Sequence, residues 1–259
     1  EVFEYIFIKD AKYPSQCGIP QSTLDKMRNE FEYWYPVDLR VSGKDLINNH
    51  LTMSLYNHAA IWPDTKKWPQ SFFTNGHAMI DAEKMSKSTG NFMTLRDSIQ
   101  KYSTDGTRFA LADAGDGLED ANFASDVASN AILKLTKETV FIRKEIDDLP
   151  NLRTTPVAFW DDAFADRVNQ CVHQAQIAYD KMLYHDVVKY GFFEMLTARD
   201  EYKANVGAPG MRRFASNWKP DRDLVERWVE VLVKMYSPVC PHWAQDIWKN
   251  TLKKARLCI

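Results

Sequence analysis

Two lysines three residues apart, Lys84 and Lys87, lie in a segment that also holds hydroxyl side chains and a glycine. The segment reads Glu83-Lys84-Met85-Ser86-Lys87-Ser88-Thr89-Gly90-Asn91. Residues 71–74 before it are typical of a strand, and a helical pattern begins at Thr94 after it. Ammonium groups and N–H donors in such a loop suit a polyphosphate whose charge is redistributing. For an isolated pair of lysines, a solvated surface loop is the commoner structure.

A second segment that could hold a nucleotide lies upstream. Residues 37–41 alternate as a strand, Ser42-Gly43 ends them, and a helical spacing of apolar residues runs from Asp45 until Pro63. A strand, a glycine turn and a helix N-terminus commonly bind a nucleotide at the carboxyl end of a parallel sheet. Taken alone, Gly43 could serve only the backbone, Asp45 could be a helix-capping residue, and the nearby His77 could be an ordinary loop histidine.

Composition bounds the class of protein. The chain has 259 residues, of which 45% are hydrophobic and 13% aromatic, enough for one large domain or two ordinary ones. The formal charge of −2 does not indicate a nucleic-acid binder, although a local basic patch would suffice for phosphate contacts. No apolar run is long enough to span a membrane, and no P-loop or Gly-x-Ser-x-Gly elbow occurs.

Cysteine and histidine spacing gives no metal or disulfide framework. The four cysteines are scattered and form no Cys-x-x-Cys pair, and no His-x-x-x-His pair occurs. We therefore expect no bound metal and a reducing compartment. The cysteines are Cys17, Cys171, Cys240 and Cys258.

The predicted elements change character along the chain. Residues 1–8 predict a strand, and residues 22–31 predict a helix capped by Ser22 or Thr23. Residues 94–102 and 103–114 predict two short helices joined through Asp105-Gly106, with a break at Gly115–Gly117. Beyond it the strand signals stop, and an antiparallel bundle of five helices is predicted at 118–146, 156–184, 185–205, 221–236 and 241–254.

The loop at 206–220 separates two of these helices and carries three cations. They are Arg212, Arg213 and Lys219. They could contact phosphate groups, and a solvated loop explains them equally well.

Taken together, these strings resemble the cytosolic (eukaryotic and archaeal-type) leucyl-tRNA synthetases, which are class I aminoacyl-tRNA synthetases. Lys-Met-Ser-Lys-Ser followed by Gly-Asn is similar to the second signature of that class. The resemblance runs along nearly the whole chain. It is carried by residues 34–46, 75–77, 83–91, 110–116, 119–123, 191–194 and 238–242.

The resemblance implies a fold that is α/β and then all-α. It implies the C-terminal half of a Rossmann-like nucleotide-binding core, followed by an antiparallel α-helical anticodon-binding bundle. The implied domains are a partial catalytic core with the lysine loop at 1–92, a helical connector that contacts the tRNA stem at 93–117, and the anticodon-binding domain at 118–259.

The resemblance also implies an activity, ATP-dependent activation of leucine and its transfer to tRNA-Leu, in the cytoplasm. Lys84 and Lys87 would be catalytic and stabilise the leaving pyrophosphate. Arg212, Arg213 and Lys219 would contact tRNA. The implied ATP-binding residues are Gly43, Asp45, His77, Met85, Ser86, Lys87 and Ser88. The substrates would be ATP with Mg²⁺, leucine and tRNA-Leu, and the resemblance allows other synthetases as partners in a larger assembly.

The chain departs from this pattern in what it lacks. It has no His-x-Gly-His signature, no editing domain and no C-terminal extension, and it begins with Glu1, which favours an incomplete chain. We therefore expect the isolated chain neither to activate leucine nor to edit. An inactive truncated paralogue that binds tRNA or protein is the alternative. A sister synthetase for isoleucine, valine or methionine would share the lysine loop but lack the string at 35–45.

Overall fold

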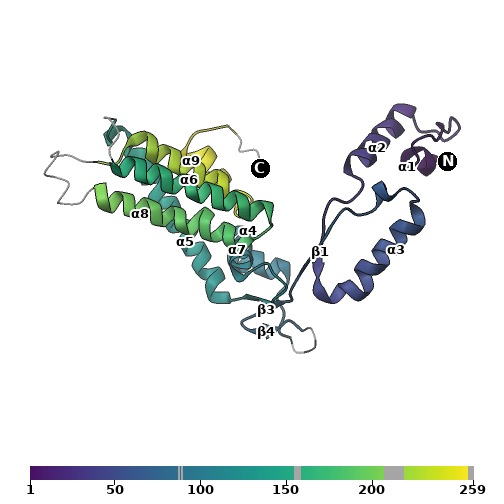
Figure 1. The fold of residues 1–259 in the computed structure, drawn as a ribbon, viewed down its shortest axis with the longest axis horizontal. Coiled ribbons are helices and arrows are strands. Elements are labelled where there is room, and N and C mark those ends of the chain that lie inside the picture. Colours follow the sequence, from purple (N-terminus) through teal and green to yellow (C-terminus); the bar gives the residue numbers. More distant parts are fainter. Residues whose placement is uncertain (87, 89, 155–158, 207–218, 256–259) are drawn as a thin grey trace. The chain divides into compact units, whose positions relative to one another are not determined.

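The computed structural model describes residues 1–86, 88, 90–154, 159–206 and 219–255 (Figure 1). Two compact units divide the chain, Glu1–Gly76 and His77–Ile259, and each is described by itself. This boundary lies before the lysine loop and is set by contacts within the chain. The division into residues 1–92, 93–117 and 118–259 remains a prediction. No helix among the described residues has the length and apolar character needed to cross a membrane.

The first unit combines short helices with a pair of parallel strands. β1 and β2 pair with Arg40 opposite Phe72 and Gly43 opposite Asn75, so their carboxyl ends meet. The parallel pair and the helical stretch that follows β1 confirm the predicted order of strand, turn and helix, but β1 includes Ser42 and Gly43 and does not include residues 37–39. The elements are α1 (Val2–Phe7), α2 (Gln21–Trp34), β1 (Arg40–Gly43), a 3₁₀ turn (Lys44–Leu46), a π turn (Ile47–Leu51), α3 (Thr52–Ile61), a 3₁₀ turn (Thr65–Lys67) and β2 (Phe72–Asn75).

The predicted strand at 1–8 is wrong, because these residues form α1. Tyr5 and Ile6 are buried against Leu24 of α2, and the Tyr5 hydroxyl donates to Asp25 Oδ1 at 2.5 Å. Packing against α2 thus overrides the strand preference of aromatic and β-branched residues, which depends strongly on context.

The start of α2 also differs from the prediction, since the N-cap is Pro20 and makes no side-chain cap. The Pro20 carbonyl instead accepts from the Thr23 and Leu24 amides at 3.0 and 3.3 Å.

The second unit places a small sheet beside a helical bundle. The sheet order is β4-β3-β5, with β3 antiparallel to β4 and parallel to β5. Its elements are β3 (Ala78–Ile80), β4 (Glu83–Lys84), α4 (Leu95–Ala114), β5 (Ala121–Phe123), α5 (Ser125–Asp148), a 3₁₀ turn (Leu149–Asn151), α6 (Phe159–Asp180), α7 (Tyr184–Val188), a π turn (Lys189–Phe193), α8 (Glu194–Val206), α9 (Arg222–Tyr236), α10 (Pro241–Asp246) and a π turn (Ile247–Thr251).

Two predictions in the second unit need correction. Strands do not stop at Gly117, because residues 121–123 form β5 and α5 begins only at Ser125. The helices at 94–114 are separated at Ser103, with φ 61° and ψ 167°, and not at Asp105-Gly106. Ser103 Oγ accepts from the Gly106 amide at 3.2 Å, so Ser103 caps a new helical turn that contains Asp105 and Gly106.

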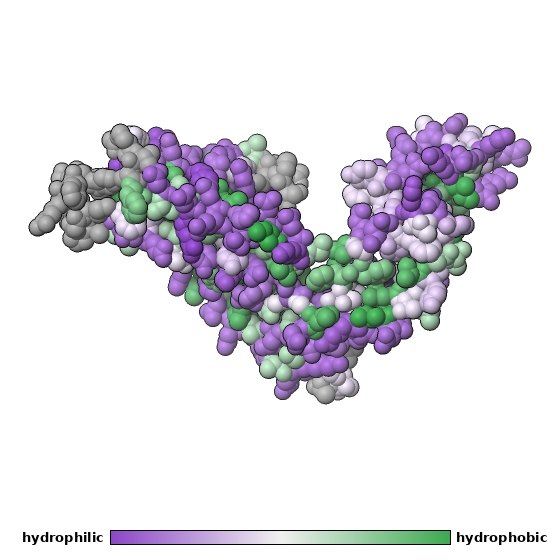
Figure 2. Space-filling view, viewed as in Figure 1, coloured by the Kyte–Doolittle hydropathy of each residue, from purple (hydrophilic) through white to green (hydrophobic). Residues whose placement is uncertain are grey.

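Among the described residues, the large core of the bundle is built from amphipathic helices, as predicted, and a smaller cluster around Tyr102 and Phe123 lies apart from it. On α9 the buried residues follow a spacing of three and four, which is the stripe of a helix packed on one face. They are Val225, Trp228, Val229, Leu232, Val233 and Tyr236. Hydrophilic residues predominate on the face of the bundle shown in Figure 2.

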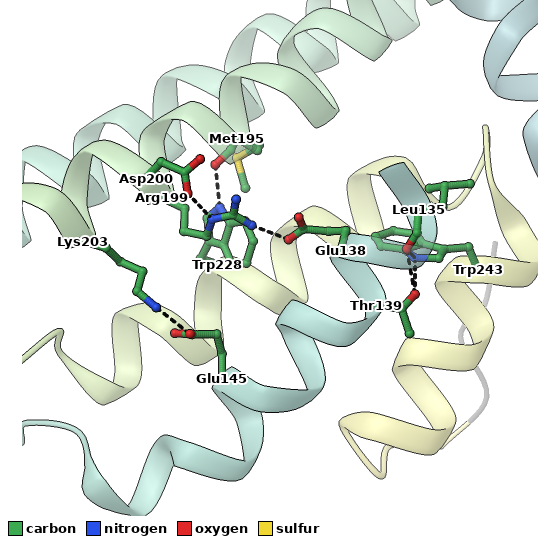
Figure 3. Close-up of polar contacts among 10 residues, drawn as sticks. All are labelled: Leu135, Glu138, Thr139, Glu145, Met195, Arg199, Asp200, Lys203, Trp228 and Trp243. Atoms are coloured by element: carbon green, nitrogen blue, oxygen red, sulfur yellow. Dashed lines mark hydrogen bonds and ion pairs between the residues drawn. The ribbon is translucent and has the colours of Figure 1, made fainter. Parts of the chain in front are cut away.

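A buried ion pair joins α5 to α8 inside this bundle (Figure 3). The Arg199 guanidinium contacts the Glu138 carboxylate and lies 4.0 Å from the Phe141 ring centre and 5.1 Å from the Trp228 ring centre. The side chains of Arg199 and Glu138 are only 11% and 7% exposed. Nearby, the Trp228 indole N–H donates to the Met195 carbonyl at 2.9 Å.

A second polar contact holds the corner between α9 and α10 against α4. Asp105, buried on α4, accepts from the Trp243 amide at 2.6 Å and from His242 Nδ1 at 3.0 Å. Arg108 donates to the carbonyls of Val239 and Pro238 at 2.9 and 2.7 Å. Asp105 thereby caps the first turn of α10, where the helix has unsatisfied N–H groups.

Candidate active site

Gly43 and Asp45 lie together at the carboxyl end of β1. The backbone at Gly43, with φ −67° and ψ 150°, is open to any residue. A Cβ built on Gly43 would nevertheless lie 2.7 Å from Asp45 Oδ1. A side chain at this position would therefore displace the Asp45 carboxylate, which lies close to the end of β1. Because β1 and β2 are parallel, this carboxylate lies at the edge where such sheets bind nucleotides.

The lysine loop stands on a two-stranded stem in the second unit. Met79 pairs with Lys84 and Ile80 with Glu83. The turn between the strands is Asp81-Ala82, with positive φ values of 48° and 68°. Right-handed twist favours such turns in hairpins. Lys84 is thus the last residue of β4, and its side chain is exposed.

Hydrogen bonds close the loop beyond this stem. The Ser86 amide donates to the Asn91 carbonyl at 2.9 Å, and the hydroxyls of Ser86 and Ser88 lie 2.9 Å apart. Asn91 Nδ2 donates to Glu83 Oε2 at 3.2 Å. The structure therefore brings Lys84, Ser86 and Ser88 into one loop.

The structure says less about the other residues of the predicted site. Met85 is 38% exposed. Lys87 lies outside the described residues. The predicted site is divided between the two units, since Gly43 and Asp45 belong to the first and His77 with the loop to the second.

His77 is held by a residue that sequence reasoning did not select. Its amide donates to Asp120 Oδ1 at 2.8 Å, and its Nδ1 lies 3.3 Å from the same oxygen. The Ala121 amide donates to the His77 carbonyl at 2.9 Å. Asp120 therefore fixes both the backbone and the ring at the start of β3.

Three further residues join the stem to the start of α5. The Asp81 carboxylate accepts from the Ser125 amide at 2.8 Å and the Ser125 hydroxyl at 2.9 Å. These two bonds hold the pKa of Asp81 below its ordinary value. Asn122 Oδ1 accepts from the Ala82 amide at 2.7 Å. The partners are 40 to 44 residues apart in the chain, and no local sequence pattern reveals such a pairing.

The cations predicted to contact tRNA are only partly described. Arg212 and Arg213 lie outside the described residues. Lys219 Nζ donates to the Asn151 carbonyl at 2.9 Å, and the Lys219 carbonyl accepts from Arg153 Nε at 3.0 Å. Lys219 thus joins the segment before α9 to the turn after α5. A contact between Lys219 and a phosphate group would have to compete with the bond to Asn151.

Within the described ranges, His, Cys, Asp and Glu side chains form no group of three or more that could hold a metal ion. The three described cysteines, Cys17, Cys171 and Cys240, are free thiols. Burial raises the pKa of the Cys171 and Cys240 thiols. A raised pKa lowers the thiolate fraction and hence the reactivity of both.

Comparison with known proteins agrees with this geometry. Residues 26–119 match the family model of the tRNA synthetases class I (C) catalytic domain, and residues 161–259 match that of the anticodon-binding domain of tRNA ligase. Both matched regions cover the elements expected from the resemblance. The fold prediction, part of a Rossmann-like class I core followed by an anticodon-binding bundle, is confirmed.

Curated relatives match almost the whole chain. The chain is 45% identical over 255 residues to "Leucine--tRNA ligase, cytoplasmic" of Arabidopsis thaliana, which covers 98% of this chain and 22% of the relative. It is 44% identical over 250 residues to the protein of the same name from Pongo abelii, covering 96% and 20%. With the Saccharomyces cerevisiae protein it shares 40% identity over 253 residues, covering 97% and 22%. The chain thus spans about a fifth of the length of these relatives.

Solved structures share the fold at low sequence identity. The ternary complex of Agrobacterium radiobacter K84 agnB2 LeuRS-tRNA-LeuAMS matches 83% of this chain and 27% of its own, with a TM-score of 0.63 and 14% identity. Mycobacterium tuberculosis methionyl-tRNA synthetase bound by methionyl-adenylate matches 92% of this chain and 48% of its own, with a TM-score of 0.66 and 18% identity. The two family models and these relatives together show that the chain is similar, along nearly its whole length, to the class I aminoacyl-tRNA synthetases and among them to the cytoplasmic leucine–tRNA ligases.

Proposed function

We propose that this chain contributes part of the catalytic core and the anticodon-binding bundle of a cytoplasmic leucine–tRNA ligase. The observation that carries the proposal is the closed loop that presents Lys84 with Ser86 and Ser88 at the end of a hairpin. Its sequence is similar to the second class I signature, and the surrounding chain is 40–45% identical to ligases of that name.

The proposed reaction has two steps. The leucine carboxylate attacks the α-phosphate of ATP, and the bond to pyrophosphate breaks to leave leucyl-adenylate. A ribose hydroxyl at the end of tRNA-Leu then attacks the leucyl carbonyl, and AMP leaves. Negative charge grows on pyrophosphate in the first step, so a cation that binds it more strongly in the transition state raises the rate. Lys84 and Lys87 would supply that cation.

The remaining site residues would bind the nucleotide. Asp45 would accept hydrogen bonds from the ribose hydroxyls, and Gly43 would let the nucleotide approach the backbone. His77 and Met85 would line the adenine side, and Ser86 and Ser88 would bind phosphate oxygens. Mg²⁺ would be held mainly through the ATP phosphates, as is usual for this ion.

The bundle would hold tRNA, and Arg212 and Arg213 would contact its phosphate groups. Lys219 would do so only after releasing the Asn151 carbonyl. Other synthetases in a larger assembly are further proposed partners.

A chimera tests the proposal. Residues 1–255 would replace the matching segment of the Saccharomyces cerevisiae ligase, to which the chain is 40% identical. We expect leucine-dependent ATP–pyrophosphate exchange and leucylation of tRNA-Leu. Changing Lys84 to Ala should lower kcat about 10²–10³-fold, the usual loss for one donor to a developing charge.

Two controls interpret the chimera. Lys144→Ala, an exposed lysine change on α5, should leave kcat unchanged. A chimera that folds and binds tRNA but catalyses no exchange would refute the enzyme proposal and favour a binding module.

A further inference from the structure

Side-chain hydrogen bonds attach the hairpin that carries the lysine loop to the segment that contains β5 and the start of α5. The shared ladder of β3 and β5 is only three residue pairs long, and β4 is a two-residue edge strand. Strands this short have little stability of their own. Asp120, Asn122 and Ser125, spaced along one segment, add bonds to His77, Ala82 and Asp81.

The bond between Asp81 and Ser125 is different in kind from the other two. Ser125 is the first residue of α5, and the N-cap residue Ala124 has no side chain that could cap the helix. The Asp81 carboxylate, in the turn between β3 and β4, caps the helix instead, because it accepts from both the amide and the hydroxyl of Ser125. A negative charge there also interacts favourably with the dipole of a 24-residue helix.

The turn that carries Asp81 is strained. Asp81 and Ala82 both have positive φ although neither is glycine. Such conformations persist where the surroundings impose them. Here the surroundings are β5, since the Asp81 amide donates to the Phe123 carbonyl at 3.2 Å and the Ala82 amide to Asn122 Oδ1, and α5, since Ser125 donates to the Asp81 carboxylate. β5 and α5 thus support the positive φ values that a two-residue hairpin turn favours.

We propose that Asp81 is a positioning residue for the lysine loop, which fixes β4, and with it Lys84, to the N-terminus of α5. Lys84 lies three residues beyond Asp81 and pairs with Met79 directly across the hairpin. The stem and α5 would then move as one body, and loop motion would be confined to residues after Lys84. A misplacement of a catalytic group by about 1 Å can cost 10²-fold in rate, so this fastening bears on the chemistry. The catalytic part of the inference rests on the proposed function.

Hydrogen exchange of the 259-residue chain tests the fastening without any substrate. In Asp81→Ala, we expect amides of residues 83–86 to exchange at least about 10-fold faster, while amides of α9 keep their rates. Ser125→Ala keeps the backbone donor and should show a smaller increase. Asp81→Asn keeps an acceptor and should restore most of the protection.

The matched control is Asp126→Ala, which removes an exposed carboxylate from the same first turn of α5. It should leave the loop amides unchanged. If Asp81→Ala resembles this control, the inference is overturned. Ser125→Ala keeps the test decisive if Asp81→Ala fails to fold.

Chemical acetylation of Lys84 tests whether Asp81 positions the Lys84 side chain or only stabilises the hairpin. In the chimera with the Saccharomyces cerevisiae ligase, ATP should protect Lys84 from acetylation, as read by mass spectrometry, while acetylation of Lys144 on α5 stays constant. In Asp81→Ala, the ATP concentration for half protection should rise about 10-fold, and Asp81→Asn should reverse most of that rise.

The outcomes separate the two proposals. Unchanged protection in Asp81→Ala, despite faster exchange, would make the contact merely structural and overturn the positioning role. Absence of ATP protection in the chimera without the Asp81 change would count against the proposed function, while the exchange rates of the 259-residue chain would still decide whether Asp81 holds the stem to α5.

Discussion

Arg199 offers a quantitative test of how the bundle is stabilised (Figure 3). Changing Arg199 to Met removes the guanidinium but retains an apolar stem between Phe141 and Trp228. The Glu138 carboxylate, 7% exposed, would then be buried without its cation. Breaking a buried ion pair in this way typically costs about 3–5 kcal/mol. We expect a loss of this size in the free energy of unfolding at pH 7.

The pH dependence follows from the state of Glu138. Burial raises the pKa of Glu138, and the Arg199 cation only partly opposes this effect. In the unfolded chain the pKa of a Glu carboxyl is about 4.3. Because the folded pKa is higher, protonation of Glu138 favours the folded state; this contribution to stability is fully present below the unfolded pKa and is lost as pH rises through the folded pKa. Without Arg199 the folded pKa rises further. The loss caused by Arg199→Met should therefore shrink as pH falls from 8 toward 5.

The assay is urea unfolding followed by far-ultraviolet circular dichroism, with a matched control on α5. Arg143 pairs with Asp246 at 2.9 Å, but these side chains are 52% and 40% exposed. Arg143→Met should therefore cost no more than about 1 kcal/mol. The double change Glu138→Gln with Arg199→Met should recover most of the loss. An Arg199→Met loss no larger than that of Arg143→Met would refute the reasoning.

Three further changes probe other contacts. Asp105→Ala removes the acceptor of the buried Trp243 amide and should cost about 1–3 kcal/mol, seen as a lower Tm; an unchanged Tm would contradict the capping role. Ala82→Gly relieves a left-handed alanine and should raise the free energy of unfolding by about 1 kcal/mol, measured in urea, whereas a loss would show that the turn is not strained. The Ser125 amide shift in NMR should titrate with a midpoint below the ordinary carboxyl pKa. Because the folded pKa of Asp81 is lowered, its stabilisation is present above the unfolded pKa and is lost as pH falls through the folded one, so the Tm difference between wild type and Asp81→Asn should vanish in acid.

Much of the fold could be predicted because its elements carry their own pattern. The buried stripe of α9 recurs at helical spacing, and Asp221 caps its first turn through the Asp223 and Leu224 amides. The alternation before Gly43 and the run before Asn75 gave the two parallel strands.

Elements defined by distant partners could not be predicted in this way. The three residues of β5 are a strand only because β3 lies beside them, and α1 is a helix because Tyr5 and Ile6 are buried against α2. Both depend on packing that a local propensity does not contain.

The same distinction applies to the candidate site. Gly43, Asp45 and the loop from Lys84 to Ser88 could be predicted as candidate site residues, because their chemical types and spacing lie in short stretches of sequence, and their roles remain predictions. Asp120, which holds His77, and Asp81, which holds the hairpin turn to Ser125, bond to partners more than 40 residues away. Each is a common surface residue when read alone.

The contact between Asp105 and Trp243 also bears on when the bundle can form during synthesis. The two residues are 138 positions apart, and Arg108 reaches Val239 across 131 positions. Contacts of such long range close late, because the intervening chain must first be made and ordered. During synthesis, the Asp105 carboxylate and the apolar face of α4 would remain exposed to solvent until residues 238–243 emerge from the ribosome. That interval is when a nascent chain is most exposed to aggregation and to chaperones.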